Sequence, residues 1–539
     1  PTNGTQTDTG AGGEVVGNYA TLNPLHQLAT ATLTNGNLQT TSSNPAFSTF
    51  LLKSGKWYCE HTVTATGYNL CFSQIDHPSG ATPSSSNSKS IGWYTNGTLY
   101  WQGGSVSAGA SYGIGDVLGA AIDMDNTTIT LYKNGTQATS INFSSGYHST
   151  FAEGMYVSQF NGTGHFNFGQ RAFAHTAPSG YKSLNTANLP EPTIADGSKY
   201  FDTKLYTSTG ADLAVTGLQF SPDFVWVKNR QTANHHGLFD IVRGPNKFLQ
   251  SNRSNAESTT SGSGYGTGTF NSFDANGFTV GSDVGANVTN YPSGQPHVAW
   301  AWDGGTSTVS NTDGSITSQV RANPSAGFSI VTYTGTGSSA SIGHGLNDKP
   351  RFVIVKSRSN GYSWIVWHGS FVTASNTDNL FLSATGARGD YNYDFWNNTA
   401  PTSSVVNLGT QASVNASGAT YVSYCFAPVE GYSAMGSYVG NGSADGPFVY
   451  TGFRPAFVLT KVTSRTGTWL IWDTKRGPYN TTKNTLSAET SASESTAYYD
   501  LDILSNGFKI RNGYTAVNST HTYVYAAFAE NPFKTARAS

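Results

Sequence analysis

Charged side chains are scarce in this sequence. Asp, Glu, Lys and Arg make up 11% of its 539 residues, less than half of the ~25% that is usual in soluble domains. Disordered chains combine high charge with few aromatic residues, whereas aromatic residues make up 13% of this sequence. The formal net charge is −2, and the few Lys and Arg residues are scattered along the chain. A basic surface that could neutralise phosphates is therefore excluded, and we expect no nucleic-acid partner.

Long apolar runs and cysteine are scarce too. No run of eighteen apolar residues occurs, which excludes a transmembrane helix, so we expect no membrane insertion. Three cysteines are too few, and odd in number, for a disulfide framework. Cys59, Cys71 and Cys425 each lie among strand-like apolar residues, which predicts three buried thiols. A bridge between Cys59 and Cys71 is the alternative.

The abundant residues are those of turns and strands. The chain has 61 glycines, and Ser, Thr and Asn must form most of a polar but uncharged surface. Apolar residues at 37% suffice for globular cores, and the length predicts several domains, because a single core stops growing near ~250–300 residues. We predict an all-β fold. The composition is more typical of a durable extracellular or particle-bound protein than of a cytosolic enzyme.

Residues 51–170 alternate strand-like runs with turn clusters about ten residues apart, the pattern of a β-sandwich. Five motifs in this stretch resemble those of the SPRY domain, a concanavalin-like sandwich: Gly55–Glu60 (GKWYCE), Gly115–Gly119 (GDVLG), Asp123–Asp125 (DMD), Leu131–Gly135 (LYKNG) and Phe166–Gly169 (FNFG). The resemblance implies a binding scaffold whose loops at one edge take protein or peptide partners. It implies no catalysis.

Two groups in this domain are candidate sites. Trp93, Tyr94 and Trp101 could form a platform that stacks on a sugar, although alternation along their strands favours at least two of them in the core. Asp123 and Asp125 offer oxygen ligands that suit a hard cation. Two carboxylates in a β-turn without further acidic residues favour turn capping instead. Of these two groups, the three aromatic residues are the candidate ligand-binding residues. We predict no metal site.

From about residue 196 the sequence repeats itself three times. Each copy has an apolar strand that follows a proline and ends in lysine: Phe224–Lys228, Phe352–Lys356 and Phe457–Lys461. A tyrosine-led turn begins about 22 residues before each lysine, at Tyr206, Tyr333 and Tyr438. The closing strands also match: His297–Trp302, Tyr421–Phe426 and Tyr523–Phe528. Each unit has about 105 residues, the size of one β-sandwich domain.

The copies differ in one pair of charges. The first copy has Asp240 and Arg243, and the third has Asp473 and Arg476, at the same spacing. In the second copy His368 replaces the acid and an apolar residue replaces the arginine. Because both charges are absent together, we predict that they are structural pairs across a turn. One acid and one base are too few converging groups for a catalytic site.

The lysine-ended strands are continuously apolar, so both of their faces must be covered, by an opposing sheet and by a neighbouring domain or subunit. A rigid stack of domains is expected. We predict the following layout: 1–45 an N-terminal arm, 46–175 the SPRY-like sandwich, 176–195 a linker, 196–305 repeat 1, 306–326 a linker, 327–430 repeat 2 and 431–535 repeat 3.

The junction after the first domain carries a second resemblance. The runs Phe168–Phe173 (FGQRAF) and Lys182–Pro190 (KSLNTANLP) are similar to the junction between SPRY and tail regions in structural proteins of bacteriophages, marine phages especially. The repeats that follow resemble an uncharacterised phage β-domain. This resemblance implies a virion protein that is made in the host cytoplasm and assembled into the particle.

Enzymatic function is disfavoured. Glycosidases need two carboxylates about 5 to 9 Å apart, whereas Glu60, Glu153 and Asp123 lie in separate segments, and no nucleophile, zinc or phosphate motif is present. His235 and His236 are adjacent, so on a strand they would point to opposite faces, and we predict a solvated loop pair. We expect no cofactor.

A tail fibre or attachment appendage that binds host-surface glycan or protein is the leading hypothesis. A head decoration, head fibre or tail-associated structural protein without receptor binding is the alternative, and a glycan-degrading enzyme is a third. The expected partners are other virion proteins and the host receptor. A homo-oligomer is expected, with a trimer favoured.

Overall fold

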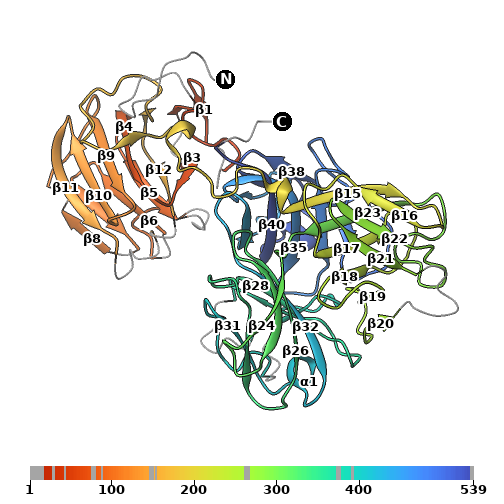
Figure 1. Ribbon diagram of the computed structural model, residues 1–539. Helices are drawn as coiled ribbons and strands as arrows, with labels where there is room; N and C mark the ends of the chain where they lie inside the picture. Colours follow the sequence, from red (N-terminus) through yellow and green to blue (C-terminus); the bar gives the residue numbers. More distant parts are fainter. Residues whose placement is uncertain are drawn as a thin grey trace. The chain divides into compact units, whose positions relative to one another are not determined.

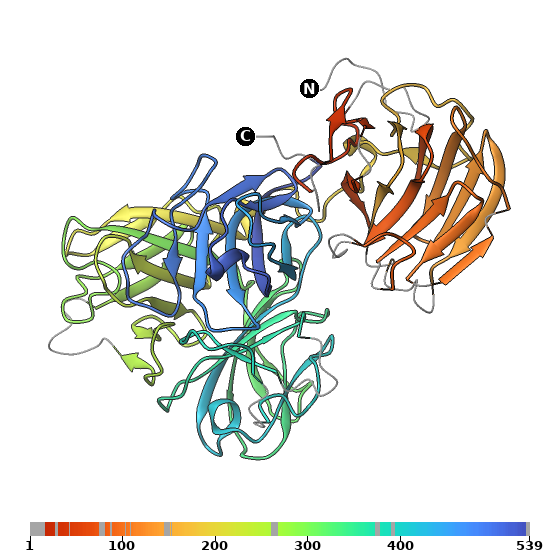
Figure 2. The same cartoon turned by 180° about the vertical axis from the view of Figure 1, so that it is seen from behind.

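A computed structural model describes residues 17–26, 31–41, 44–74, 81–86, 89–102, 104–107, 109–144, 151, 154–259, 268–371, 378–389 and 394–534. The fold is almost all β, with 45% of the residues in strands and 3% in helices, which confirms the predicted class (Figures 1 and 2). Contacts divide the chain into two units, 1–191 and 192–539, and each is considered by itself. Within the described residues no helix is long and apolar enough to cross a membrane.

The first unit is a sandwich of two antiparallel sheets, drawn in red to orange (Figure 1). One sheet consists of β1 (Leu33–Thr34), β2 (Gln39–Thr40), β13 (Thr163–Asn167), β4 (Lys56–Ala65), β9 (Val117–Asp123), β10 (Thr128–Lys133) and β11 (Thr136–Asn142), with β14 (Lys182–Ser183) beside β4. The other consists of β3 (Ala46–Leu52), β12 (Met155–Phe160), β5 (Tyr68–Gln74), β6 (Ser90–Tyr94), β7 (Thr98–Trp101) and β8 (Gly104–Ser107).

Alternate residues of both sheets form the core of this sandwich. Leu70 and Trp93 from one sheet, and Ile122 and Leu131 from the other, are fully buried. Cys59, Cys71 and Cys425, the last in the second unit, are all free and buried, as the sequence predicts.

The predicted arm 1–45 and most of the predicted linker 176–195 belong to the first unit. Strands β1 and β2 lie within the predicted arm, and β2 pairs with β13; arm residues 1–16, 27–30 and 42–43 lie outside the described residues. In the predicted linker 176–195, β14 pairs in parallel with β4, and a 3₁₀ turn η2 (Thr186–Asn188) follows. The physical reason is burial, since Leu22 and Leu184 are both fully buried.

The second unit contains three sandwiches of similar topology, which we call copy 1 (196–305), copy 2 (327–430) and copy 3 (431–535). Copy 1 has a main sheet of β15 (Phe201–Thr207), β23 (Pro296–Trp302), β17 (Phe224–Asn229) and β18 (Gly237–Asp240). Its second sheet is β16 (Leu213–Thr216), β22 (Gly277–Val280) and β21 (Phe270–Asp274), and β19 (Lys247–Phe248) pairs with β20 (Ser258–Thr259).

Copies 2 and 3 repeat this strand order. In copy 2 the main sheet holds β26 (Phe328–Thr334), β32 (Thr420–Phe426), β28 (Phe352–Ser357), β29 (Ile365–His368) and β30 (Leu380–Phe381), and β27 (Ala340–Gly343) pairs with β31 (Val405–Leu408). In copy 3 it holds β33 (Ser433–Val439), β40 (Thr522–Pro532), β35 (Phe453–Val462), β36 (Trp469–Asp473) and β37 (Leu486–Ser487), and the second sheet is β34 (Phe448–Tyr450), β39 (Gly507–Ile510) and β38 (Leu501–Leu504). Short helices α1 (Ala412–Asn415) and α2 (Thr515–Asn518) precede the closing strands.

The predicted linker 306–326 is also part of a sheet. Strands β24 (Thr308–Asn311) and β25 (Ser318–Asn323) form a hairpin, and β25 pairs with β26 at the edge of copy 2. Alternate side chains of this polar hairpin reach the core, because Ser318 and Val320 are buried. The segment therefore widens copy 2.

Copies 1 and 3 share a turn with the sequence N-G-F, Asn276–Phe278 and Asn506–Phe508, and its glycine allows close approach of the backbone. A Cβ atom at Gly277 would lie 2.0 Å from the carbonyl oxygen of Val215 in the paired strand. A Cβ atom at Gly507 would lie at the same 2.0 Å from the Val449 oxygen. The glycine lets the second sheet pair tightly in copies 1 and 3.

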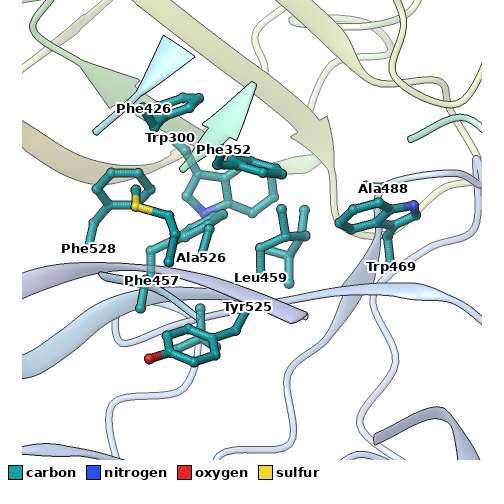
Figure 3. Close-up of a cluster of buried hydrophobic side chains, with 14 of the residues drawn as sticks. Trp300, Phe352, Phe426, Phe457, Leu459, Trp469, Ala488, Tyr525, Ala526 and Phe528 are labelled. Atoms are coloured by element: carbon teal, nitrogen blue, oxygen red, sulfur yellow. The ribbon is translucent and has the colours of Figure 1, made fainter. Parts of the chain in front are cut away.

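The lysine-ended strands are covered on both faces, as predicted. In β17, Val225 and Val227 belong to the core of copy 1. Phe224 and Trp226, on the opposite face, belong to a larger cluster that includes residues of all three copies. The three copies therefore share one central core, whose side chains Figure 3 shows.

Equivalent aromatic residues meet at the middle of this shared core. Trp302, Phe426 and Phe528 occupy equivalent positions on the three closing strands, β23, β32 and β40. Their ring centroids are 6.3 Å apart for Trp302 and Phe426, 5.6 Å for Trp302 and Phe528, and 5.6 Å for Phe426 and Phe528. Each copy thus contacts both others through the same residue, which is the arrangement of an approximate threefold ring.

Candidate functional site

The first seam of the ring joins copy 1 to copy 2 around Asp240. Its carboxylate accepts hydrogen bonds from the side chain and the backbone N–H of Arg243, and Tyr424 of copy 2 donates its hydroxyl at 2.8 Å. Arg243 also donates to Glu257 at 3.1 Å and to the Leu238 carbonyl at 2.8 Å. The turn pair predicted from the sequence thus lies inside an interface between copies.

The equivalent seam joins copy 3 to copy 1. Asp473 accepts from the Nε of Arg476 at 2.5 Å and from its backbone N–H at 2.8 Å. Trp300 of copy 1 donates its indole N–H to the same carboxylate at 3.0 Å, and Arg476 donates to Glu494 at 3.0 Å. Trp300 in copy 1 is equivalent in sequence position to Tyr424 in copy 2.

The seam between copies 2 and 3 uses no such charge pair. His368 Nδ1 accepts from the Ser370 N–H at 3.1 Å, which leaves Nε2 to donate to the Tyr525 carbonyl at 3.1 Å. Burial lowers the pKa of His368 to about 4, so the ring is neutral at pH 7. Arg388 stacks over the Phe371 ring at 5.8 Å, where the other seams have a glutamate–arginine pair. A cation–π contact therefore replaces the ion pair.

A second set of hydrogen bonds also runs around the ring. Three equivalent side chains each donate to a backbone carbonyl of the neighbouring copy: Trp364 to Gln250 at 2.8 Å, Trp469 to Phe381 at 2.9 Å and His236 to Ser487 at 3.0 Å. The prediction of a solvated His235–His236 pair was wrong for His236, which is fully buried. Its Nδ1 accepts from Trp226 at 2.8 Å, so it takes the place of a seam tryptophan.

The lysine that ends each apolar strand is buried as well, and no role for its amine was predicted from the sequence. Lys228, Lys356 and Lys461 are all fully buried. The amine of each donates to two backbone carbonyls, for example Lys228 to Asn229 at 2.7 Å and to Thr232 at 3.4 Å. Burial lowers the pKa of Lys228 and Lys356 to about 7, and that of Lys461 to about 8. Two acceptors match the two N–H groups of a neutral amine.

The aromatic residues proposed as a sugar platform do not form one surface. Trp93 is fully buried, and its indole N–H donates to the Ala110 carbonyl at 3.2 Å. Tyr94 points to the other face of the sheet, because neighbours on a strand alternate, and its ring lies 4.7 Å from that of Tyr68. Trp101 shares the face of Trp93 by the same alternation.

The carboxylates Asp123 and Asp125 cap turns. Asp123 accepts from the Asn126 N–H at 3.0 Å and pairs with Lys56 at 3.0 Å. Asp125 accepts from the Gly55 N–H at 2.7 Å. Among the described residues no group of three or more His, Cys, Asp or Glu side chains is placed to hold a metal ion.

Two hollows in the described part of the second unit are considered. The shared core encloses a cavity of about 20 Å³, lined by aromatic and aliphatic side chains of all three copies, which has room for little more than one water molecule. A larger cleft of about 400 Å³ opens on copy 1 and is lined mostly by polar residues: Ala233, Asn234, His235, Phe248, Gln250, Arg253, Asn255, Ser258, Gly285, Ala286 and Asn287. We call it the copy 1 cleft. Its size suits a small polar ligand.

The profile of the family described as a domain of unknown function (DUF7483) matches residues 196–532, more than half of the chain. The chain belongs to the DUF7483 family. That match spans all three copies, so one DUF7483 domain corresponds to the whole ring rather than to a single sandwich. A SPRY domain also matches, over residues 42–171.

Several solved structures are similar to part of this DUF7483 protein. They include the SPRY domain of human HERC1 (16% identity, 27% of this chain and 95% of that chain, TM-score 0.22). Stonustoxin (20% identity, 28% and 26%, TM-score 0.22) and the PSpry domain of TRIM65 (14% identity, 28% and 91%, TM-score 0.23) are similar too. This chain spans about a quarter of the length of stonustoxin. No curated protein matches the sequence.

Proposed function

We propose that this DUF7483 protein is a binding component of a bacteriophage virion, a tail fibre or attachment appendage that contacts glycan or protein on the host surface. The copy 1 cleft carries the proposal, because it is a concave polar site on a scaffold that the seams hold rigid. Binding proteins commonly present recognition residues on loops of such scaffolds. The phage part of the proposal rests on the junction runs Phe168–Phe173 and Lys182–Pro190.

The role of the ionisable groups supports binding over catalysis. The buried acids Asp240 and Asp473 pair with arginine in seams. Glu60, in the first unit, accepts from the backbone N–H groups of Ala174 at 2.7 Å and His175 at 2.9 Å, so it holds a loop in place. A glycosidase needs two carboxylates that face one substrate bond, and among the described residues that line the copy 1 cleft none carries a carboxylate.

Adsorption to cells tests the proposal. The full chain, labelled with a fluorophore, should bind cells of a susceptible bacterium and should compete with the intact phage for adsorption. Antibodies against the chain should label the tail of the particle in electron micrographs. Incubation with host capsule or lipopolysaccharide should release no reducing ends.

The alternative is a structural virion component without receptor binding. Label on the head or tail shaft, together with no adsorption to cells, would establish that alternative and reject the attachment role. The predicted homotrimer is tested by the mass of the purified chain in solution.

A further inference from the structure

The copy 1 cleft is built from a loop insertion that the other copies do not have. Each copy has a buried asparagine whose amide donates to a carbonyl earlier in the chain: Asn290 to Gly281, Asn415 to Gly409 and Asn518 to Asn512. The separation is nine residues in copy 1 and six in copies 2 and 3. The longer loop supplies Gly285, Ala286 and Asn287, which line one wall of the cleft.

That wall is held in a fixed conformation. The Asp283 carboxylate accepts hydrogen bonds from the backbone N–H groups of Val288 and Thr289, both at 2.6 Å, and of Asn290 at 3.2 Å. Asp283 and Asn287 both have left-handed backbone angles, φ 56° in each case. Hydrogen bonds within the loop therefore hold its conformation without a ligand.

The opposite wall is fixed by the seam with copy 2. Trp364 donates its indole N–H to the Gln250 carbonyl at 2.8 Å and to the Arg253 carbonyl at 3.2 Å. These bonds hold the backbone and leave both side chains to line the cleft. Among the residues that the structure describes, the Arg253 guanidinium has no hydrogen-bond or ion-pair partner.

The lining residues are not needed by the fold, because the other copies do without them. Three backbone hydrogen bonds show which residues are equivalent in the three copies. The N–H of Glu257 donates to the carbonyl of Arg358, that of Arg388 to the carbonyl of Thr463 and that of Glu494 to the carbonyl of Arg230. The three donors follow Gln250, Phe381 and Ser487, whose carbonyls accept the hydrogen bonds between copies, at the same separation in sequence, so the three segments align without a gap. In copies 2 and 3 the position of His235 is occupied by Ser363 and Thr468, respectively. The position of Gln250 is occupied by Phe381 and Ser487. The position of Arg253 is occupied by Ala384 and Thr490.

The side chains in the cleft define a ligand chemistry. Asparagine and glutamine amides both donate and accept, which matches sugar hydroxyls, and a guanidinium pairs with a carboxylate or sulfate in a bidentate way. Buried amide atoms Asn234 Nδ2 and Asn287 Oδ1 have no hydrogen-bond partner among the described residues. The lining residues that the structure describes include no acidic side chain that would compete for Arg253.

We propose that the copy 1 cleft binds an acidic sugar residue, with the anionic group on Arg253 and the hydroxyls on Asn234, Gln250 and Asn287. This assignment rests on the binding function proposed above and names its ligand. Carboxylate and sulfate share the required chemistry, so the acidic sugar is either a uronic acid or a sulfated hexose.

Ligand-observed NMR on the full chain at low salt tests the assignment with sodium glucuronate, galactose 6-sulfate and neutral glucose. We expect saturation transfer to at least one acidic sugar and none to glucose. Arg253→Ala should weaken the binding roughly tenfold or more, because it removes charge-assisted hydrogen bonds. His235→Ser and Gln250→Ser should weaken it less.

The three variants carry residues that other copies have at these positions, so they are compatible with the fold, and unfolding curves verify this. Arg465→Ala, which removes an exposed arginine of copy 3, is the matched control and should leave binding unchanged. Equal binding of glucose, or full binding by Arg253→Ala, overturns the proposal. A chain that adheres to cells but binds neither acidic sugar refutes the ligand assignment and leaves the attachment role standing.

Discussion

Trp300 of copy 1 donates its indole N–H to the Asp473 carboxylate of copy 3 at 3.0 Å. Both side chains are fully buried, and the same carboxylate accepts two hydrogen bonds from Arg476. Asp473 therefore caps its own turn in copy 3 and also binds copy 3 to copy 1 through this hydrogen bond. This contact closes the ring, so the ends of the repeat region are not exposed edges.

Trp300→Phe should destabilise the ring, because it keeps an aromatic ring but removes the donor to a buried carboxylate. A hydrogen bond to a charged group contributes about 1.5 to 3 kcal/mol. We expect a loss of that order in the free energy of unfolding of the second unit, measured by urea denaturation.

Trp302→Phe on the same strand is the control for the loss of ring volume. The indole N–H of Trp302 has no partner among the described residues, and copies 2 and 3 have Phe426 and Phe528 at this position. If Trp302→Phe costs as much as Trp300→Phe, the hydrogen bond to Asp473 contributes nothing measurable.

Asp240 and Arg243 should behave as one unit in a double-mutant cycle. Removal of one partner leaves a buried charge, which typically costs about 3 to 5 kcal/mol. Asp240→Ala alone should therefore cost about as much stability as Asp240→Ala with Arg243→Ala. Fully additive losses in chemical denaturation would reject the pairing.

The stability of the second unit should rise with pH above 7. Burial lowers the pKa of Lys228 to about 7, whereas the amine of the unfolded chain has its ordinary pKa near ~10.4. Between these values the unfolded chain binds a proton that the folded chain does not, so the free energy of unfolding increases with pH, by up to about 1.4 kcal/mol per pH unit for each such amine.

Lys228→Met should reduce this slope between pH 7 and 9.5, and unfolding at several pH values measures it. Above pH 10 the buried tyrosines act in the opposite direction, because burial raises the pKa of Tyr333 and Tyr438. Lys475→Met, at an exposed lysine, is the control. An unchanged slope in Lys228→Met contradicts a neutral buried amine.

The seam between copies 2 and 3 should accept the ion pair of the other seams. Phe371→Arg alone would place a second guanidinium beside Arg388 and should cost about 3 kcal/mol or more. Adding Arg388→Glu places a carboxylate beside the new arginine, as Glu257 lies beside Arg243 in the first seam, and should restore part of the loss; the restoration is incomplete because Arg388 also pairs with Asp378 at 3.5 Å. A double variant no more stable than Phe371→Arg contradicts the equivalence of the seams.

Much of the architecture could be predicted from the sequence. The SPRY motifs, the repeats and the two-sided burial of strands such as Phe224–Lys228 all follow from local residue order, because a strand that is apolar at every position must be covered twice. The pairing of Asp240 with Arg243 could be inferred from their joint absence in copy 2. Each of these signals lies within one copy or in a comparison between copies.

The ring, the cleft and the state of single residues could not be predicted in this way. His236 follows a run of polar residues and resembles a loop histidine, yet it is buried because Ser487, 251 residues away, lies against it. Gln250 and Asn287 meet in one cleft only because the seam fixes one wall and the longer loop supplies the other. The sequence by itself determined the strands, their buried faces and the threefold repetition, since these depend on residue order. Only the tertiary structure decided which copy covers which face, because contacts between copies depend on distances that no local pattern encodes.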